Sequence, residues 1–245
     1  MKKILAAALV AMLSTTAPAF AQNAPVVQED AAFAEKLRTT LLAHPEYIMN
    51  AMQGMEARDR EQRTRLLNEK VGPLRAKMFA KGFGPVVGNP AGTAVAVEFV
   101  DYACPICKTA HKAVDAVVAK RKDVRVVIAQ RLIFGPDSEK LARFALASDL
   151  QGKFAATHDA LYDAFGDHHE TKPTDEKLKA IAATVGLDYD RAVKDMNGPQ
   201  VTKTFADQMA TADQIGVSGT PFFVTKDNVL AGYPGSEEAL SAAIK

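Results

Sequence analysis

Apolar residues recur at helical spacing through the first part of the chain and at strand spacing only later. From residue 29 to about residue 78, apolar side chains return every three or four positions, which is the period of an amphipathic helix. The residues that define this period are Leu37, Leu41, Leu42, Ile48, Met52 and Met55. The sequence therefore predicts an N-terminal helical segment.

Three features subdivide this helical segment. Pro45 can start a second helix, because proline is tolerated in the first turn. Gly72-Pro73 is expected to break or kink that helix. Residues 56–65 have almost no apolar face, so we expect either a solvent-bridging rod or a mobile linker there.

After a loop rich in glycine and proline at 82–90, which we interpret as a domain boundary, strand and helix patterns alternate. The order predicts an α/β domain of three or four strands with a helical insertion, preceded by a helical arm. The expected elements are a strand at 93–100, a helix at 104–121, a strand at 124–134, a helical block at about 137–215, a hairpin of strands at 221–225 and 228–231, and a helix at 237–244.

The first residues resemble a cleavable export signal. Lys2 and Lys3 precede an apolar run at 4–13, and Ala19-Phe20-Ala21 has the small-x-small pattern of a cleavage site. The run is shorter than the roughly 20 residues that span a bilayer, although a membrane anchor is the alternative. We expect a signal peptide at 1–21 and a mature protein in a bacterial periplasm, where disulfides persist.

Composition excludes several classes of protein. The chain has 30 basic and 29 acidic residues, and a nucleic-acid-binding protein would usually carry a basic excess. There is no tryptophan, so nothing indicates a base-stacking or sugar-stacking surface. Two cysteines are too few for a disulfide scaffold or for a zinc site with four thiolates.

Those two cysteines form the motif Cys104-Pro105-Ile106-Cys107 between a predicted strand and a predicted helix. The free amides and the dipole of a helix N-terminus stabilise a thiolate, which lowers the pKa of a cysteine there. We therefore expect Cys104 to be the exposed nucleophile. Cys107, one turn deeper, would attack a mixed disulfide formed on Cys104 and release the product.

Two other interpretations of the motif are a zinc site and an inert disulfide. A zinc site needs further ligands, and a short disulfide loop stabilises a chain little. The candidate ligands are histidines that we expect instead to be solvated or to cap helices, namely His111, His158, His168 and His169.

A second motif, Gly216-Val-Ser-Gly-Thr-Pro-Phe-Phe223, places Pro221 at a strand start after a glycine turn, where a cis peptide is plausible. A strand, a C-x-x-C helix and a late Thr-Pro before a hairpin and a final helix resemble the thioredoxin fold. Glu98-Phe99, six residues before the Cys-Pro-x-Cys motif, and the helical insertion resemble its DsbA-like branch.

This resemblance covers about 86–245 and implies roles for particular residues. It implies a cis bond at Thr220-Pro221 beside Cys104, where substrate backbone is held, and we expect Pro105 and Ile106 to contact substrate as well. It also implies that Glu98 is a buried acid that helps move the proton of Cys107. The apolar neighbours of Glu98 favour burial and a raised pKa, whereas the alternative is a salt-bridged edge residue.

Two departures from a simple DsbA-like oxidant suggest a subgroup. Thr220, rather than valine, precedes the expected cis-proline, as in isomerases and reductases of the wider family. Residues 22–81 precede the catalytic domain at 82–245, and this extension resembles the ScsC (suppressor of copper sensitivity) group. Members of that group with a long N-terminal segment are trimeric isomerases. The alternative is that the N-terminal helices pack on their own catalytic domain.

The resemblance implies a periplasmic disulfide isomerase or reductase that acts on unfolded or misoxidised exported proteins. A membrane redox partner would keep the cysteine pair reduced, and the arm would form a homotrimer. Several active sites around one client raise the effective concentration of thiol. The alternatives are a dithiol oxidase, a chaperone that does not need its cysteines, and a copper-tolerance protein that holds Cu(I) on Cys104 and Cys107. We expect no other cofactor and no nucleic-acid partner.

Overall fold

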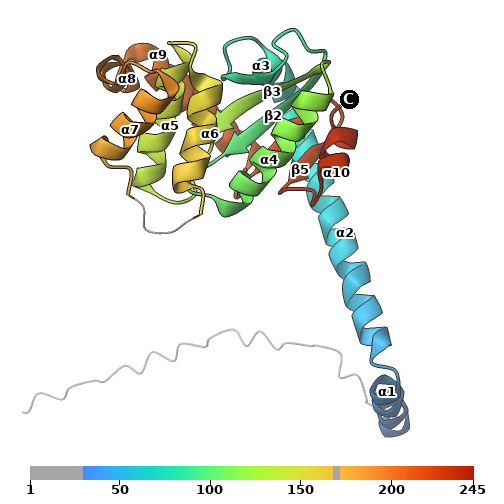
Figure 1. Ribbon diagram of the computed structural model, residues 1–245. Coiled ribbons are helices and arrows are strands. Elements are labelled where there is room, and N and C mark those ends of the chain that lie inside the picture. The colour runs from blue at the N-terminus through green and yellow to red at the C-terminus, as the bar shows by residue number, and fades with distance from the viewer. Residues whose placement is uncertain (1–29, 168–171) are drawn as a thin grey trace, which may run out of the picture. The chain divides into compact units, whose positions relative to one another are not determined.

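The computed structural model describes residues 30–167 and 172–245 (Figure 1). The expected signal peptide at 1–21 lies outside these residues, as do His168 and His169. The chain divides into two compact units, Met1–Gly54 and Met55–Lys245. Within the described residues, no helix has the length and apolar character needed to cross a membrane.

The N-terminal helices begin and end where proline and capping residues predict. Helix α1 covers Ala31–Ala43, and the Asp30 carboxylate caps it by accepting from the Ala32 and Phe33 amides. Helix α2 covers Glu46–Val71, directly after the proline expected to start it. The predicted break is also present, because a 3₁₀ turn η1 (Gly72–Leu74) separates α2 from α3 (Arg75–Phe79).

A five-stranded sheet in the order β1-β3-β2-β4-β5 forms the centre of the second unit (Figure 1). Strands β2 and β3 run parallel, and the other neighbouring pairs are antiparallel. Every residue of the central strand β2 is buried, as its β-branched sequence predicts. The strands are β1 (Val86–Gly88), β2 (Ala94–Val100), β3 (Val124–Gln130), β4 (Phe222–Thr225) and β5 (Val229–Ala231).

Two sequence predictions about the strands were wrong. Residues 82–90 were expected to be a loop, but β1 lies within them and pairs with β3, so the sheet has five strands and not three or four. Strand β3 ends at Gln130 instead of residue 134. The reason is that the Ile133 and Phe134 amides donate to the Asp101 carboxylate, which draws the chain out of the sheet.

Alternate residues of β2 enter two different cores. Ala96 and Val100 pack with helices α4 and α10 on one face, while Val97 and Phe99 pack with the end of α2, α3 and the end of α9 on the other. In the described residues, the predicted insertion consists of five helices between β3 and β4. The helices that follow β2 along the chain are α4 (Pro105–Lys120), α5 (Pro136–Asp149), α6 (Phe154–Phe165), α7 (Asp175–Val185), α8 (Tyr189–Met196), α9 (Pro199–Ile215) and α10 (Glu237–Ala243).

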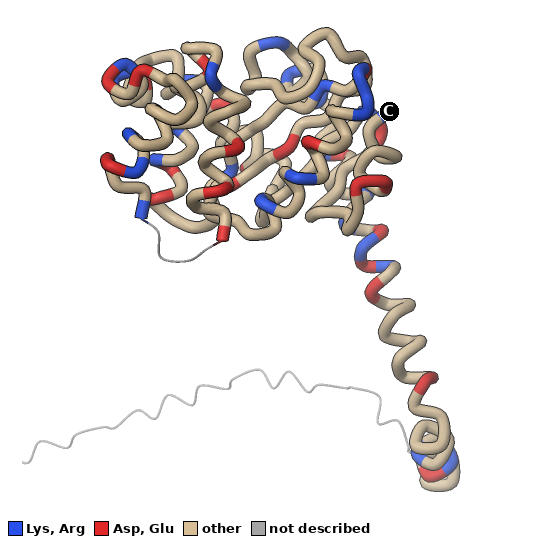
Figure 2. Tube along the Cα trace, in the orientation of Figure 1, with Lys and Arg blue, Asp and Glu red and all other residues tan. Residues whose placement is uncertain are grey.

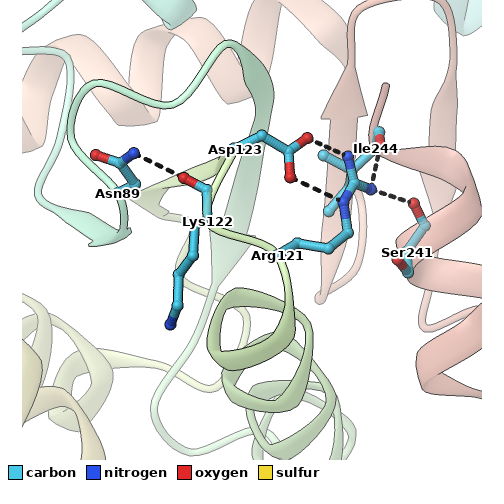
Figure 3. A network of polar contacts seen from close by, with 6 residues as sticks. All are labelled: Asn89, Arg121, Lys122, Asp123, Ser241 and Ile244. Carbon is cyan, nitrogen blue, oxygen red and sulfur yellow. Dashed lines mark hydrogen bonds and ion pairs between the residues drawn. The ribbon is translucent and has the colours of Figure 1, made fainter.

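Arg121 joins the end of α4 to the end of the chain (Figure 3). Its guanidinium donates to the Ser241 and Ile244 carbonyls at 2.8 and 2.6 Å. It also pairs with Asp123 at 2.6 Å. These contacts fix α10 against α4, the helix that carries both cysteines.

The catalytic unit starts earlier than the loop at 82–90, where the sequence placed a boundary. Val71 and Met78 are fully buried against the sheet, and Leu67 packs on the same core. Arg75 donates to the Thr225 carbonyl at 3.0 Å, across the turn between β4 and β5. The second half of α2 is therefore part of the unit that contains the sheet.

Candidate active site

Cys104 is the N-cap residue of α4, in the turn that connects the central strand to that helix. Its backbone is extended (φ −94°, ψ 115°), and its Sγ accepts from the Cys107 amide at 3.4 Å. Proline at the first helical position needs no hydrogen-bond acceptor, so Pro105 fits there without cost. The sulfur thus occupies the place of a capping oxygen, as the sequence predicted.

The two thiols have opposite pKa shifts. A hydrogen bond from the Cys107 thiol, together with the Cys107 and Ile106 amides, lowers the pKa of Cys104 to about 6. Cys107 is fully buried, and this burial, reinforced by the nearby Cys104 and Glu98, raises its pKa far above the usual value. At neutral pH the pair therefore consists of one thiolate and one protonated thiol.

The Thr220–Pro221 segment lies directly against Cys104. The peptide bond between these residues is cis, and the Cys104 Sγ lies 3.4 Å from the Thr220 carbonyl oxygen, to which the protonated form of the thiol donates. The chain reaches this position from Gly216, which ends α9 at a φ of +85° that favours glycine. The two motifs, 116 residues apart, therefore meet as the sequence predicted.

Cys104 is less accessible than the sequence suggested. It is only 3% exposed, so the expectation of an exposed nucleophile was wrong. Its neighbour Pro105 is exposed, and Ile106 is 55% exposed. Ile133, beside Asp101, is 38% exposed. The two residues that directly follow Cys104 are therefore exposed and apolar.

Glu98 is buried in the central strand, as expected, and is not a salt-bridged edge residue. It is 1% exposed, and its Oε1 has no hydrogen-bond partner among the described residues. Burial raises its pKa to about 8, and the charges of Asp115 and Cys104 add to this shift. The charge of this carboxyl is one of the influences that raise the pKa of Cys107.

Asp101 fixes the turn that carries Cys104, and sequence analysis missed it. Its buried carboxylate accepts from the Ala103 amide, the Ser138 hydroxyl and the Ile133 amide at 2.9, 2.7 and 2.8 Å. The Cys104 amide donates to the Asp101 carbonyl at 3.1 Å. One residue therefore ties the active-site turn to the first helix of the insertion. Its position next to a buried strand was the available signal.

Two histidines that were expected to be solvated or capping are buried instead. His158 is 1% exposed, and its Nδ1 lies 2.8 Å from the Tyr102 hydroxyl. His111 is 7% exposed and pairs through Nε2 with Asp159 at 3.1 Å. The two histidines lie on α4 and α6, and aromatic side chains surround them in place of solvent. The rings of Tyr102, Tyr162 and both histidines pack together.

The described residues offer one candidate group of metal ligands, and neither cysteine belongs to it. The group consists of His111, Asp115 and Asp159, with ligand atoms within 4.8 Å of one another. Both carboxylates already pair with the His111 ring.

The sequence pattern of the DSBA-like thioredoxin domain matches residues 95–244, from the central strand to the last helix. The chain belongs to this family. The match includes both cysteines and the cis-proline segment, so it agrees with the resemblance drawn from the two motifs.

Solved structures with the same fold include other DsbA-like and thioredoxin-like proteins. A thioredoxin-like oxidoreductase from Silicibacter pomeroyi is 37% identical and covers 69% of this chain and 95% of its own, with a TM-score of 0.62. Proteus mirabilis ScsC in a transitional conformation covers 89% of this chain and 95% of its own at 20% identity and a TM-score of 0.61. A periplasmic thioredoxin-like protein from Salmonella enterica serovar Typhimurium is 25% identical, covers 70% and 93%, and has a TM-score of 0.57.

The curated relatives are longer proteins that are named as Na⁺/H⁺ antiporters. A protein named Na⁺/H⁺ antiporter NhaA 3 from Salinispora tropica is 32% identical over 150 residues, which are 60% of this chain and 22% of that protein. This chain thus spans about a fifth of the curated relatives it matches. The similarity covers only that part of each relative and does not extend over its whole length.

Proposed function

We propose that this DsbA-like protein is a thiol–disulfide oxidoreductase that isomerises or reduces disulfides in unfolded or misoxidised exported proteins. The observation that carries the proposal is the opposite pKa shift of the two thiols, with Cys104 lowered to about 6 and Cys107 raised. Cys104 is ionised at neutral pH and can therefore attack a disulfide. Cys107 is protonated and does not at once attack the mixed disulfide that forms.

The reaction begins with the Cys104 thiolate. It attacks one sulfur of a client disulfide, a Cys104–client disulfide forms, and the other client sulfur leaves as a thiolate. In isomerisation a different client thiolate then attacks the client sulfur of this mixed disulfide. A new client disulfide forms, and the Cys104 thiolate is regenerated without net oxidation or reduction.

Reduction needs the second cysteine. Cys107 loses its proton and attacks the Cys104 sulfur, a Cys104–Cys107 disulfide forms, and the client leaves with two thiols. Because burial raises the pKa of Cys107, this step needs a group that accepts the proton. Glu98, with a pKa of about 8 in the same interior, is suited to exchange that proton once it is ionised. A membrane redox partner would then supply two electrons to the disulfide.

Client binding in this proposal uses the residues that surround Cys104. Thr220 and Pro221 lie against the sulfur and would hold client backbone, while the exposed Pro105 and Ile106 would contact client side chains. Exposed apolar residues suit unfolded clients, because such chains expose apolar side chains that a folded protein buries.

The N-terminal unit would join several copies of the chain, and we propose a homotrimer. Its helices leave large apolar side chains open to solvent, including Phe33 at 64%, Leu42 at 70% and Met52 at 52%. Soluble proteins rarely expose contiguous apolar surface of this kind unless it binds a partner. The export signal expected at 1–21 and the periplasmic Salmonella structure support a periplasmic location.

The test is recovery of activity from a ribonuclease with scrambled disulfides. Cys104→Ser should abolish recovery, whereas Cys107→Ser should retain part of the isomerisation but lose catalytic reduction. If Cys104→Ser retains activity, the mechanism is wrong. The redox potential of the pair separates an isomerase from the alternative, a dithiol oxidase, since an oxidase has a much less negative potential.

A second candidate role, the binding of Cu(I), uses the sulfur atoms of Cys104 and Cys107. Two adjacent thiols, one of them a thiolate at neutral pH, suit Cu(I), which favours soft sulfur ligands. Titration of the reduced protein with Cu(I), compared with the Cys104→Ser/Cys107→Ser variant, should show one copper per chain in the parent alone. Equal binding by both proteins would reject this role.

A further inference from the structure

A groove separates the second half of α2 from the segment that joins α9 to β4. At one end Gly219, Thr220 and Pro221 line it, and at the other end Glu56 and Arg60 of α2 line it. The two ends are continuous, because the same four residues line both. These shared residues are Leu67, Gly216, Ser218 and Ala231.

The groove begins beside a residue that contacts the reactive sulfur. The carbonyl of Thr220, which lines its first part, lies 3.4 Å from the Cys104 Sγ. From Leu67 to Glu56 the axis of α2 extends about 16 Å at 1.5 Å per residue. About five residues of an extended polypeptide cover that distance. A chain attached to Cys104 and passing Thr220 can therefore continue along the groove.

The walls of the groove can contact both the backbone and the charged side chains of such a chain. Gly216 and Gly219 carry no side chains, so another backbone can approach closely. Along α2, moving away from Thr220, the groove is lined first by Lys70, then by the basic pair Arg63 and Arg60.

Acidic residues Asp59 and Glu56 line the far end of the groove, and acidic and basic residues are interspersed along this half of α2 (Figure 2). None of the five charged side chains that line the groove forms an ion pair with another described residue. Leu66 adds apolar surface and is 49% exposed.

We propose that this groove is a client subsite, which holds an extended segment of the unfolded polypeptide while its cysteine is bonded to Cys104. The segment favoured nearest Thr220 is acidic, because Lys70, Arg63 and Arg60 are the first charges it meets. This inference rests on the proposed function. It gives the second half of α2 a role in client selection, separate from any role of the N-terminal unit in assembly.

The experiment measures how fast the full-length reduced protein takes up cysteine peptides. Each peptide carries its cysteine as a mixed disulfide with a coloured aromatic thiol. Attack by Cys104 on the peptide sulfur forms the Cys104–peptide disulfide and releases the coloured thiolate. The peptides are one capped cysteine alone and cysteine with five acidic or five basic residues added on its N-terminal or its C-terminal side.

The protein should react several-fold faster with one of the acidic extensions than with its basic counterpart. The variant Arg60→Glu/Arg63→Glu should reverse that preference. The matched control Arg58→Glu/Arg65→Glu makes the same charge change on the same helix, but neither of its residues lines this groove, and it should keep the original preference. All three proteins should react equally with the capped cysteine.

Two negative results are distinguishable. If the capped cysteine fails to react with the parent protein, the proposed function itself is wrong. If it reacts but the extensions make no difference, or if both double variants change the preference equally, the groove is not a client subsite. A preference that disappears in both variants would show only long-range attraction by net charge, and it would also overturn the inference.

Discussion

The Tyr102 hydroxyl lies 2.8 Å from Nδ1 of His158, and both side chains are buried behind the cysteine turn. Burial lowers the pKa of His158 well below the usual value and raises that of Tyr102, so both groups are neutral. One hydrogen bond therefore joins the hydroxyl to the ring nitrogen, and its direction depends on the tautomer of His158. This bond ties the residue two positions before Cys104 to helix α6 of the insertion.

Tyr102→Phe should destabilise the protein by about 1–2 kcal/mol, because it leaves the His158 nitrogen buried without its hydrogen-bond partner. Tyr162→Phe is the matched control, since the Tyr162 hydroxyl is buried in the same cluster and has no partner among the described residues. Urea unfolding should show a loss for the first variant and little change for the second. Equal losses would mean that the hydrogen bond contributes nothing specific.

The low pKa of Cys104 predicts the pH dependence of its reactivity. Alkylation of Cys104 by iodoacetamide, followed by mass spectrometry of the labelled peptide, should increase with pH around a midpoint of about 6. Cys107 should stay unlabelled over the same range, because burial raises its pKa. A midpoint near 8.5, the ordinary value for a thiol, would remove the basis of the proposed mechanism.

The same shift should appear in stability. The pKa of Cys104 is lower in the folded protein than in the unfolded chain, so the unfolded chain binds more protons between about pH 6 and the ordinary thiol value. The stability of the reduced protein relative to Cys104→Ser should therefore rise across this window and be lost as pH falls through 6. A pH-independent difference between the two proteins would contradict the shift.

The contribution of Glu98 to stability should change with pH in the opposite direction. Its pKa is raised to about 8, so the folded protein keeps a proton that the unfolded chain loses above about pH 4.5. Glu98→Gln should thus become more stable than the parent as pH rises from 4.5 to 8, by up to about 1.4 kcal/mol per pH unit. The variant should also slow resolution by Cys107 while alkylation of Cys104 keeps its rate. A slower first attack would instead indicate damage to the turn.

The contacts of Arg121 with the end of the chain predict a purely structural effect. Arg121→Met removes two charge-assisted hydrogen bonds to carbonyls at the C-terminal end of α10 and should lower the free energy of unfolding by about 2 kcal/mol (Figure 3). Asn89→Ala removes two hydrogen bonds of an uncharged side chain, one to the Lys122 carbonyl and one from the Ala91 amide, and should cost less. Chemical denaturation measures both, and the pKa of Cys104 should stay at its parent value in each.

Local patterns account for what the sequence predicted correctly. Cys104 and Pro221 were predictable from short segments. The residues on either side indicate a strand-to-helix turn at Cys104 and a strand start at Pro221. The burial of Glu98 follows from its apolar neighbours in β2 in the same way. Likewise, Pro45 and Gly72 mark a helix start and a helix break through backbone effects that need no distant partner.

Features that depend on residues far away in the sequence could not be predicted from local patterns. The bond between Tyr102 and His158 joins residues 56 positions apart, and a histidine at helical spacing gives no sign that another element will cover it. Strand β1 has three residues and exists because β3 pairs with it. The contact of the Cys104 sulfur with the Thr220 carbonyl likewise joins residues 116 positions apart.

The N-terminal unit provides the last prediction. Leu42 and Met52 are 70% and 52% exposed, and contact with other copies of the chain would bury them. Leu42→Glu/Met52→Glu should therefore sediment as a monomer and lose isomerase activity, while Cys104 alkylation keeps its rate because the site lies in the other unit. Thr39→Glu adds a charge at an exposed polar position of α1 and should leave assembly intact. If the double variant sediments like the parent, the helices of this unit do not hold the copies together.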